Sequence, residues 1–223
     1  MQDRGLAAYI AELIGTLLLT FAIGMVVSLF LATGASAATG SDFAVIGLVQ
    51  GLSLFFLIMV FGPVSGGHFN PAVTIAAAAL RRIDPIDAVV YILAQLSGAV
   101  LGALLVKGLI LDEGRASHYG AGQVTSLLGS PAAGAIVEGL GAAFIVLAIC
   151  AVAFNPRARQ EWAPLSIGLT FTFAVMIFGP LTGACFNPAR WLSATAITAS
   201  TIRKAPMPSA TAPAKLLPSR SLT

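Results

Sequence analysis

Charged side chains are scarce in this chain of 223 residues. Only 9% of the residues are Asp, Glu, Lys or Arg, and 57% are hydrophobic, whereas about 25% of the residues in soluble domains are charged. The net charge of +3 arises from twelve basic and nine acidic residues that form no dense basic block. The composition therefore excludes an ordinary cytosolic enzyme, and it offers no basic surface for a nucleic acid.

Cysteine and histidine are also rare. The two cysteines, Cys150 and Cys185, lie in apolar stretches, and the two histidines, His68 and His118, are far apart. No pair has the spacing of a redox motif or of metal ligands, and no phosphate loop or nucleophile beside a base is present. We therefore expect no enzymatic activity, no cofactor and no bound metal.

Long apolar runs, by contrast, are abundant. A helix needs about 20 apolar residues to cross a bilayer, and five runs approach or exceed that length once the fourth is extended over a single acid, Glu138. The runs are Leu13–Ala32, Phe43–Phe61, Ala88–Val106, Pro131–Phe154 and Ala163–Ala189. The sequence therefore predicts five membrane-spanning helices and a lipid bilayer as the surrounding medium.

The basic residues predict how these helices are oriented. A cytoplasmic N-terminus places Arg4, the pair at 81–82 and the pair at 157–159 in the cytoplasm, as the positive-inside rule requires. The loops at 33–42 and 112–130 then lie outside. The first span includes Glu12, directly before its apolar run, and the run is too long for a cleaved signal peptide. We expect an integral membrane protein, and the short loops suit a bacterial inner membrane.

An internal repeat organises the chain. Residues 61–72 (FGPVSGGHFNPA) recur 117 positions later at 178–189 (FGPLTGACFNPA), with eight of twelve positions identical. Each copy follows the second expected span of its half, and Glu12 and Glu138 lie in the first expected span of each half. If each unit has three spans, the second unit enters the membrane upside down, which is an inverted-repeat architecture.

Each copy of the repeat ends in Asn-Pro-Ala, a pattern that begins helices. Asn is a favoured N-cap and Pro suits the first helical turn, so we expect short helices at Pro71 to about Leu80 and Pro188 to about Ala196. Inversion would bring their N-termini face to face near the midplane, each with about +0.5 charge of helix dipole. Cations and protons would be repelled there, and neutral molecules would not.

These paired motifs resemble the aquaporin, or major intrinsic protein, family, and the resemblance runs from Leu6 to Trp191. It implies an all-α membrane protein, an inverted-repeat helical bundle with two re-entrant Asn-Pro-Ala half-helices. It also implies a passive channel for water and small uncharged solutes such as glycerol, assembled as a homotetramer. The pore motifs would be Asn70, Pro71 and Ala72 with Asn187, Pro188 and Ala189.

The same resemblance places a selectivity filter at Gln50, Val175, Ala184 and Arg190. Strict water channels have an aromatic residue and a histidine among these positions, and this chain has neither, so we expect a wider filter. Such a filter would pass solutes such as glycerol or urea, and a channel for water alone is the alternative. The Val-Ala-Arg part is similar to the plant nodulin-like branch. Gln50 has an alternative role as an interhelical hydrogen-bonding residue.

Carboxylates inside a membrane are functional by default, so Glu12 and Glu138 need a role. In a channel they would accept hydrogen bonds from the N–H groups of the re-entrant loops. In a proton-coupled secondary transporter they would instead carry protons. His68 would lie in the first loop near the cytoplasmic vestibule, either as a loop-supporting residue or as a packing residue.

The C-terminal part departs from the repeat. Adding 117 to the third run predicts a sixth span at 205–223, yet the sequence from Leu192 onward has ten Ser and Thr, four Pro, four basic residues and no acid. Such a composition predicts a disordered basic tail over 192–223. We therefore expect a channel domain at 1–191, with repeat 1 at about 6–111 and an incomplete repeat 2 at about 131–191. A channel without its sixth helix would lack one wall of the pore. The alternative to a working channel is therefore a non-conducting remnant.

Overall fold

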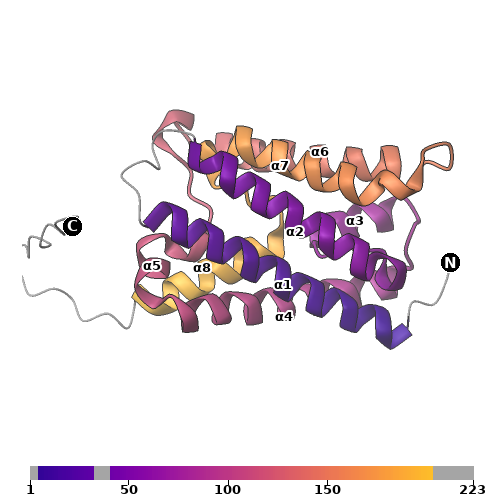
Figure 1. Ribbon diagram of the computed structural model, residues 1–223, viewed down its shortest axis with the longest axis horizontal. Helices are drawn as coiled ribbons and strands as arrows, with labels where there is room; N and C mark the ends of the chain where they lie inside the picture. Colours follow the sequence, from indigo (N-terminus) through magenta and orange to yellow (C-terminus); the bar gives the residue numbers. More distant parts are fainter. Residues whose placement is uncertain (1–4, 33–40, 203–223) are drawn as a thin grey trace, which may run out of the picture.

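The computed structural model describes residues 5–32 and 41–202, and all regular structure within them is helical (Figure 1). Five long helices form the body of the bundle. They are α1 (Gly5–Ala32), α2 (Ser41–Ser65), α4 (Pro85–Leu109), α6 (Pro131–Val152) and α7 (Ala163–Thr182). Three shorter helices are α3 (Pro71–Ala79), α5 (Leu111–Ala116) and α8 (Pro188–Ile202).

Each long helix is long and apolar enough to cross a membrane, and the described residues contain five such helices. Large apolar side chains lie on their outer surfaces, with Phe56 62% exposed and Leu147 65% exposed. A helix that is apolar on all sides is typical of a membrane span. Five helices with the length and composition of membrane spans are therefore present where the sequence predicts them, and the chain is an integral membrane protein.

The helices pack as two close pairs, α1 with α4 and α2 with α7. Glycines permit this approach, because a Cβ atom on Gly98 would lie 2.2 Å from the carbonyl oxygen of Leu13. A Cβ on Gly51 would lie 2.4 Å from the carbonyl oxygen of Gly168. Small residues at such contacts are a general feature of membrane helix pairs.

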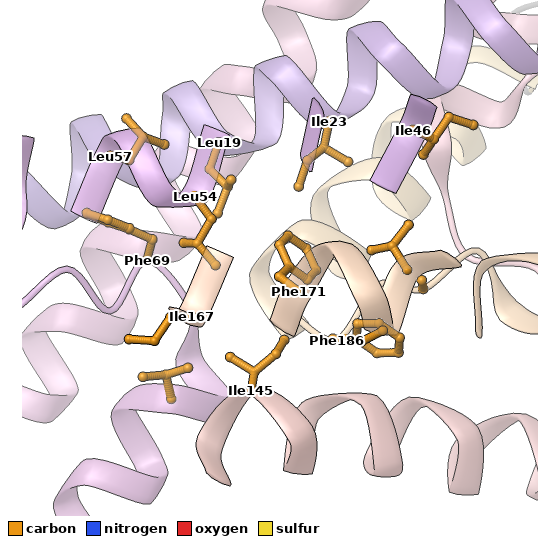
Figure 2. Packing of buried hydrophobic residues seen from close by; sticks show 14 of the residues in the cluster. Leu19, Ile23, Ile46, Leu54, Leu57, Phe69, Ile145, Ile167, Phe171 and Phe186 are labelled. Carbon is orange, nitrogen blue, oxygen red and sulfur yellow. The ribbon is translucent and has the colours of Figure 1, made fainter. Parts of the chain in front are cut away.

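An apolar cluster surrounds the loops that lead into the half-helices α3 and α8. The cluster combines side chains of α1, α2, α6 and α7 with the loop residues Phe69 and Phe186. Figure 2 shows Ile23 of α1, Leu54 of α2 and Phe171 of α7 in this interior. The loops are therefore buried in protein, as irregular backbone at membrane depth must be.

The C-terminal boundary requires a correction. Helix α8 continues to Ile202, so residues 192–202 are helical and do not belong to a disordered tail. Two features stabilise the extension. Ile197 packs on Ala103 and Val106 of α4, and the Thr198 hydroxyl donates to the carbonyl of His118 at 2.7 Å. The predicted tail beyond residue 202, including positions 205–223 where the repeat would place a sixth span, lies outside the described residues.

The segment at 112–130, expected to be a plain loop, contains local helical structure. It carries most of α5 and two single turns, His118–Gly120 and Ser126–Leu128. The segment packs against α1 and α8, and Ser117 donates a hydrogen bond to Ser28 of α1 at 2.9 Å. It is thereby held over one end of the bundle.

Candidate pore

The two re-entrant loops have matching backbone conformations. In the first, Gly66, Gly67 and Phe69 have φ angles of 90°, 67° and 48°. In the second, Gly183, Ala184 and Phe186 have φ angles of 81°, 48° and 48°. Repeated left-handed residues prevent a helix or a strand from forming, so successive N–H and C=O groups point in different directions. Each loop thus has N–H groups to direct at a partner.

In the first loop that partner is Glu12 of α1, which is fully buried. Its Oε1 accepts from the Ser65 hydroxyl at 2.6 Å and from the His68 N–H at 2.9 Å. Its Oε2 accepts from the Phe69 N–H at 2.7 Å and from the Gln95 side chain at 2.7 Å. Four donors therefore compensate the burial of one carboxylate.

The second loop repeats this arrangement around Glu138 of α6, which is only partly buried. Its Oε1 accepts from the Thr182 hydroxyl at 2.5 Å and from the Cys185 N–H at 3.1 Å. Its Oε2 accepts from the Phe186 N–H at 2.7 Å. The hydrogen bonds from loop N–H groups that the sequence predicts are present for both acids. The first loop has one further donor, Gln95, whose repeat counterpart, position 212, is not described.

A glycine one turn after each acid makes room for a loop phenylalanine. A Cβ atom on Gly15 would lie 2.1 Å from the ring of Phe69, and one on Gly141 would lie 2.0 Å from the ring of Phe186. The Glu-x-x-Gly spacing in both halves thus places a carboxylate and a gap side by side. The carboxylate binds the N–H of the phenylalanine, and the gap receives its ring.

The two Asn-Pro-Ala motifs meet and hydrogen-bond to each other. Asn70 caps α3 by accepting from the Ala72 N–H at 2.9 Å, and Asn187 accepts from the Ala189 N–H at 3.0 Å. The Asn70 amide also donates to the carbonyl of Phe186 at 2.8 Å, and the Asn187 amide donates to the carbonyl of Phe69 at 2.9 Å. The N-termini of α3 and α8 are therefore joined in the interior.

A cavity of about 640 Å³ leads to this meeting point. Its lining includes Arg82, Phe154 and Glu161 as well as Asn70 and Asn187. Most of the lining is apolar, and loop residues 66–68 are part of it. A mostly apolar cavity with a few polar groups is typical of ligand-binding cavities.

His68 is one of the residues that line this cavity. Its side chain is 7% exposed and lines the cavity. Its Nδ1 is 3.1 Å from the Thr74 hydroxyl, and its ring packs edge-on against Tyr91. The structure thus gives His68 both a loop-supporting hydrogen bond and a packing contact. No group of three or more His, Cys, Asp or Glu that could hold a metal occurs within residues 5–32 and 41–202.

The four candidate filter residues are all buried. Gln50, Val175 and Ala184 are 0% exposed, and Arg190 is 2% exposed. The Arg190 guanidinium donates to the carbonyl of Ala184 at 3.0 Å and to that of Gly120 at 3.1 Å. Neither amide atom of Gln50 has a hydrogen-bond partner among the described residues. Arg190 is therefore held in place, whereas the Gln50 amide is not.

Several supporting groups were not anticipated from the sequence. Gln95 donates to both Glu12 and Thr74, and Ser65 and Thr182 occupy equivalent positions beside the two acids. The serine and threonine are aligned by the internal repeat, which could have revealed them. The carbonyl of Gly120 has no side-chain signature, and only the folded segment at 112–130 brings it to Arg190.

A second hollow, of about 450 Å³, lies on the other side of the second loop. Its lining includes Gly134, Glu138 and Ala142 of α6 and Trp191 of α8. Cys185 and Asn187 are part of its lining and also of the lining of the first cavity. The second loop therefore separates the two spaces.

Comparison with known proteins places the chain in a family. The sequence model of the protein family described as Major intrinsic protein matches residues 2–205 of this chain. Glycerol uptake facilitator protein-like 6 of Lactiplantibacillus plantarum is 36% identical over 182 residues, covering 82% of this chain and 80% of that protein. Nodulin-26 of Glycine max is 40% identical over 147 residues, covering 66% of this chain and 52% of that protein. The chain thus spans about half of nodulin-26.

The fold has a counterpart among solved structures. The X-ray structure of the aquaglyceroporin from Plasmodium falciparum matches with a TM-score of 0.75 and 24% sequence identity, covering 89% of this chain and 83% of that one. This likeness extends over the helical bundle, and the family model covers both Asn-Pro-Ala motifs. The chain belongs to the major intrinsic protein family.

Proposed function

We propose that this protein is a passive membrane channel for water and small uncharged solutes. The observation that carries the proposal is the reciprocal pair of hydrogen bonds between the two motifs, Asn70 to Phe186 and Asn187 to Phe69, beside a cavity that both asparagines line. The described residues use one N–H of each amide, and each NH₂ group has two. The second N–H of each asparagine serves the permeating molecule.

Electrostatics explains why the path would pass only neutral molecules. The N-termini of α3 and α8 meet at the asparagines, and each adds about +0.5 charge of helix dipole. The guanidinium of Arg190, three residues after Asn187, adds a full positive charge. Cations and protons are repelled by this field, while water and uncharged solutes are not.

The filter positions set the size limit in this proposal. Val175 and Ala184 have small side chains, and both belong to the central apolar cluster. Together with Gln50 and Arg190 they would form a constriction without an aromatic ring. Glycerol and urea are therefore expected to pass as well as water. Relatives that are a glycerol uptake facilitator and aquaporins agree with this solute class.

Glu12 and Glu138 act as supports in this scheme and not as proton carriers. Each carboxylate accepts two loop N–H groups, and protonation would remove acceptors that hold the loop in shape. The arrangement therefore favours a channel over a proton-coupled transporter. An imposed pH gradient is expected to leave solute entry unchanged.

In the membrane we propose a cytoplasmic N-terminus, because the basic residues at 81–82 and 157–159 then lie on the cytoplasmic side. A bacterial plasma membrane suits the short connections. By resemblance to the family we propose a homotetramer in which each subunit has its own pore.

Osmotic shrinkage of proteoliposomes, followed by stopped-flow light scattering, tests the function. A sucrose gradient should cause fast shrinkage with a low activation energy, and a glycerol gradient should cause shrinkage followed by re-swelling. A pH-sensitive dye inside the vesicles should report no added proton leak. Rates equal to those of protein-free vesicles, with insertion verified, would contradict the proposal and favour a non-conducting protein.

A further inference from the structure

Helix α6 is the least covered of the five spans. Within an 18-residue apolar stretch, 17% of α6 is buried, whereas 50% of α1 is buried. The second hollow, of about 450 Å³, borders α6 over Gly134, Ala135, Glu138, Gly139 and Ala142. These positions recur every three or four residues, so they form one face of the helix. Ala135 and Gly139 are exposed, so this face, with its carboxylate, meets whatever surrounds the bundle.

The first repeat shows what covers the equivalent face of α1. Glu12 corresponds to Glu138, and α4 packs on α1 beside it. Gln95 of α4 donates to Oε2 of Glu12 at 2.7 Å. Gly98 of α4 lies so close to α1 that a Cβ atom on it would be 2.2 Å from the carbonyl oxygen of Leu13. A helix with an amide side chain and small contact residues thus covers the first acid.

In the second repeat the matching positions lack these contacts among the described residues. Gly139 follows its acid directly, as Leu13 does, and a Cβ atom on Gly139 would meet nothing within 4 Å. Oε2 of Glu138 accepts one hydrogen bond, from the Phe186 N–H, whereas Oε2 of Glu12 accepts two. A carboxylate oxygen can accept two hydrogen bonds, and a carboxylate at membrane depth is stabilised by each donor that it gains. This face therefore fits a partner that brings a donor.

We propose that a transmembrane helix from outside residues 1–223 docks on this face of α6. It runs parallel to α6, as α4 runs parallel to α1 (Figure 1), it has small residues at the contact, and it has a side-chain amide at the level of Glu138. Residues 203–223 have four prolines, four basic residues and no apolar run of span length. A second copy of the chain has no amide to offer, because its span glutamines, Gln50 and Gln95, are fully buried.

The probe is a synthetic peptide with the sequence of residues 85–109, because α4 is the helix that binds the equivalent face of α1. Ser97→Cys in the peptide carries a dansyl group, at a position that is exposed on α4. The energy donor is Trp191, which lines the hollow, and Trp162→Phe makes it the only tryptophan of the full-length protein. We expect saturable energy transfer in detergent at a one-to-one ratio. This readout is independent of the proposed channel function.

Two matched comparisons locate the binding. A peptide that also carries Gln95→Leu lacks the amide and should bind about 3–10-fold more weakly, as one interhelical hydrogen bond in a membrane protein predicts. In the protein, Ala135→Leu fills part of the hollow and should weaken binding by about tenfold or more. Ala151→Leu is the same change on the opposite face of α6 and should leave the affinity unchanged.

Four results would overturn the inference. Energy transfer that does not saturate would show that detergent or lipid chains fill the hollow. Equal binding by the Ala135→Leu and Ala151→Leu proteins would place the peptide elsewhere on the bundle. Self-association of the chain that Ala135→Leu abolishes would assign the face to a second copy. Equal affinity of the two peptides would remove the role of the amide, and this comparison needs no change on α6, so it holds even if a leucine variant folds poorly.

Discussion

The side-chain amide of Asn70 donates a hydrogen bond of 2.8 Å to the backbone carbonyl of Phe186, 116 residues away. The bond from Asn187 to Phe69 is its counterpart in the other repeat. Each asparagine therefore caps its own half-helix and at the same time binds the loop of the other half. The centre of the protein is completed only when both loops are in place.

Substitution of either asparagine by alanine should weaken both repeats. Asn70→Ala removes a helix cap, with a typical contribution of about 1 kcal/mol, and a hydrogen bond of about 1 kcal/mol. We expect the free energy of unfolding to fall by about 2 kcal/mol, measured by thermal unfolding in detergent. Asn187→Ala should have a similar effect.

The double variant provides the critical comparison. If the two loops support each other, Asn70→Ala with Asn187→Ala should lose less than the sum of the single losses, because the first change already loosens the contact that the second removes. Strictly additive losses would show that the two repeats are energetically independent at this point.

Gly141→Ala should destabilise the protein far more than Gly139→Ala, although both residues lie on the same helix. A Cβ at Gly141 would lie 2.0 Å from the Phe186 ring, whereas one at Gly139 has nothing within 4 Å. We expect Gly141→Ala to destabilise the protein by about 1–3 kcal/mol through overpacking. Gly139→Ala should be neutral or stabilising by up to about 1 kcal/mol, because alanine favours the helix.

Solute permeability gives an independent reading of the Gly141 variant. A displaced Phe186 ring moves the backbone that Asn70 binds, so Gly141→Ala should slow water flux in proteoliposomes. If both glycine variants unfold at the same temperature and conduct water equally, the contact between residue 141 and the Phe186 ring affects neither stability nor permeability, and the prediction is wrong.

Glu12→Gln should destabilise the protein more than Glu138→Gln does. Glutamine keeps one acceptor oxygen and replaces the other by an NH₂ group that faces donors. Glu12 is fully buried with four donors, whereas Glu138 is partly exposed with three. We expect a loss of about 3 kcal/mol or more at Glu12, since hydrogen bonds to charged groups are worth about 1.5–3 kcal/mol each, and a smaller loss at Glu138.

The measurement is the melting temperature of each variant in the same detergent, with Gln95→Leu as a companion. Gln95→Leu removes one hydrogen-bond donor from Glu12. Its melting temperature should lie between those of the unchanged protein and of Glu12→Gln. Equal melting temperatures for Glu12→Gln and Glu138→Gln would contradict the role given to burial and to Gln95.

The left-handed loop positions predict opposite effects for a matched pair of substitutions. Gly67 and Ala184 are equivalent in the repeats and have φ angles of 67° and 48°. Gly67→Ala should lower the free energy of unfolding by about 1 kcal/mol, and Ala184→Gly should raise it by a similar amount, because a Cβ strains this region. A Cβ at Gly67 meets no atom closer than 3.4 Å, so crowding does not confuse the comparison. Thermal unfolding of both variants measures these effects. Melting temperatures that shift in the same direction for both variants would argue against the backbone explanation.

Local sequence patterns predict much of this architecture. The five spans follow from apolar runs, and the starts of α3 and α8 follow from Asn and Pro at adjacent positions, because capping depends on neighbours in the chain. The end of α8 does not follow in this way. The hydroxyls of Ser200 and Thr201 donate to the carbonyl of Ile197 within the helix, so a composition that is typical of a tail is accommodated in a helix.

Groups that act at a distance along the chain were the least predictable. Gln95 is 83 residues from Glu12, and the carbonyl of Gly120 is 70 residues from Arg190. Neither has a local motif, because a backbone carbonyl carries no sequence signal and a glutamine in a span has several possible roles. For Gln50 the sequence leaves a filter role and an interhelical role open, and its lack of a partner is visible only in three dimensions.

Cys185 and Asn187 contribute to the linings of both hollows, one on each side of the second loop. At these two residues the two spaces share part of their lining. A displacement of residues 183–186 would therefore alter the shape of both spaces at once. The bonds from Cys185 and Phe186 to Glu138 hold this shared lining in position on its α6 side.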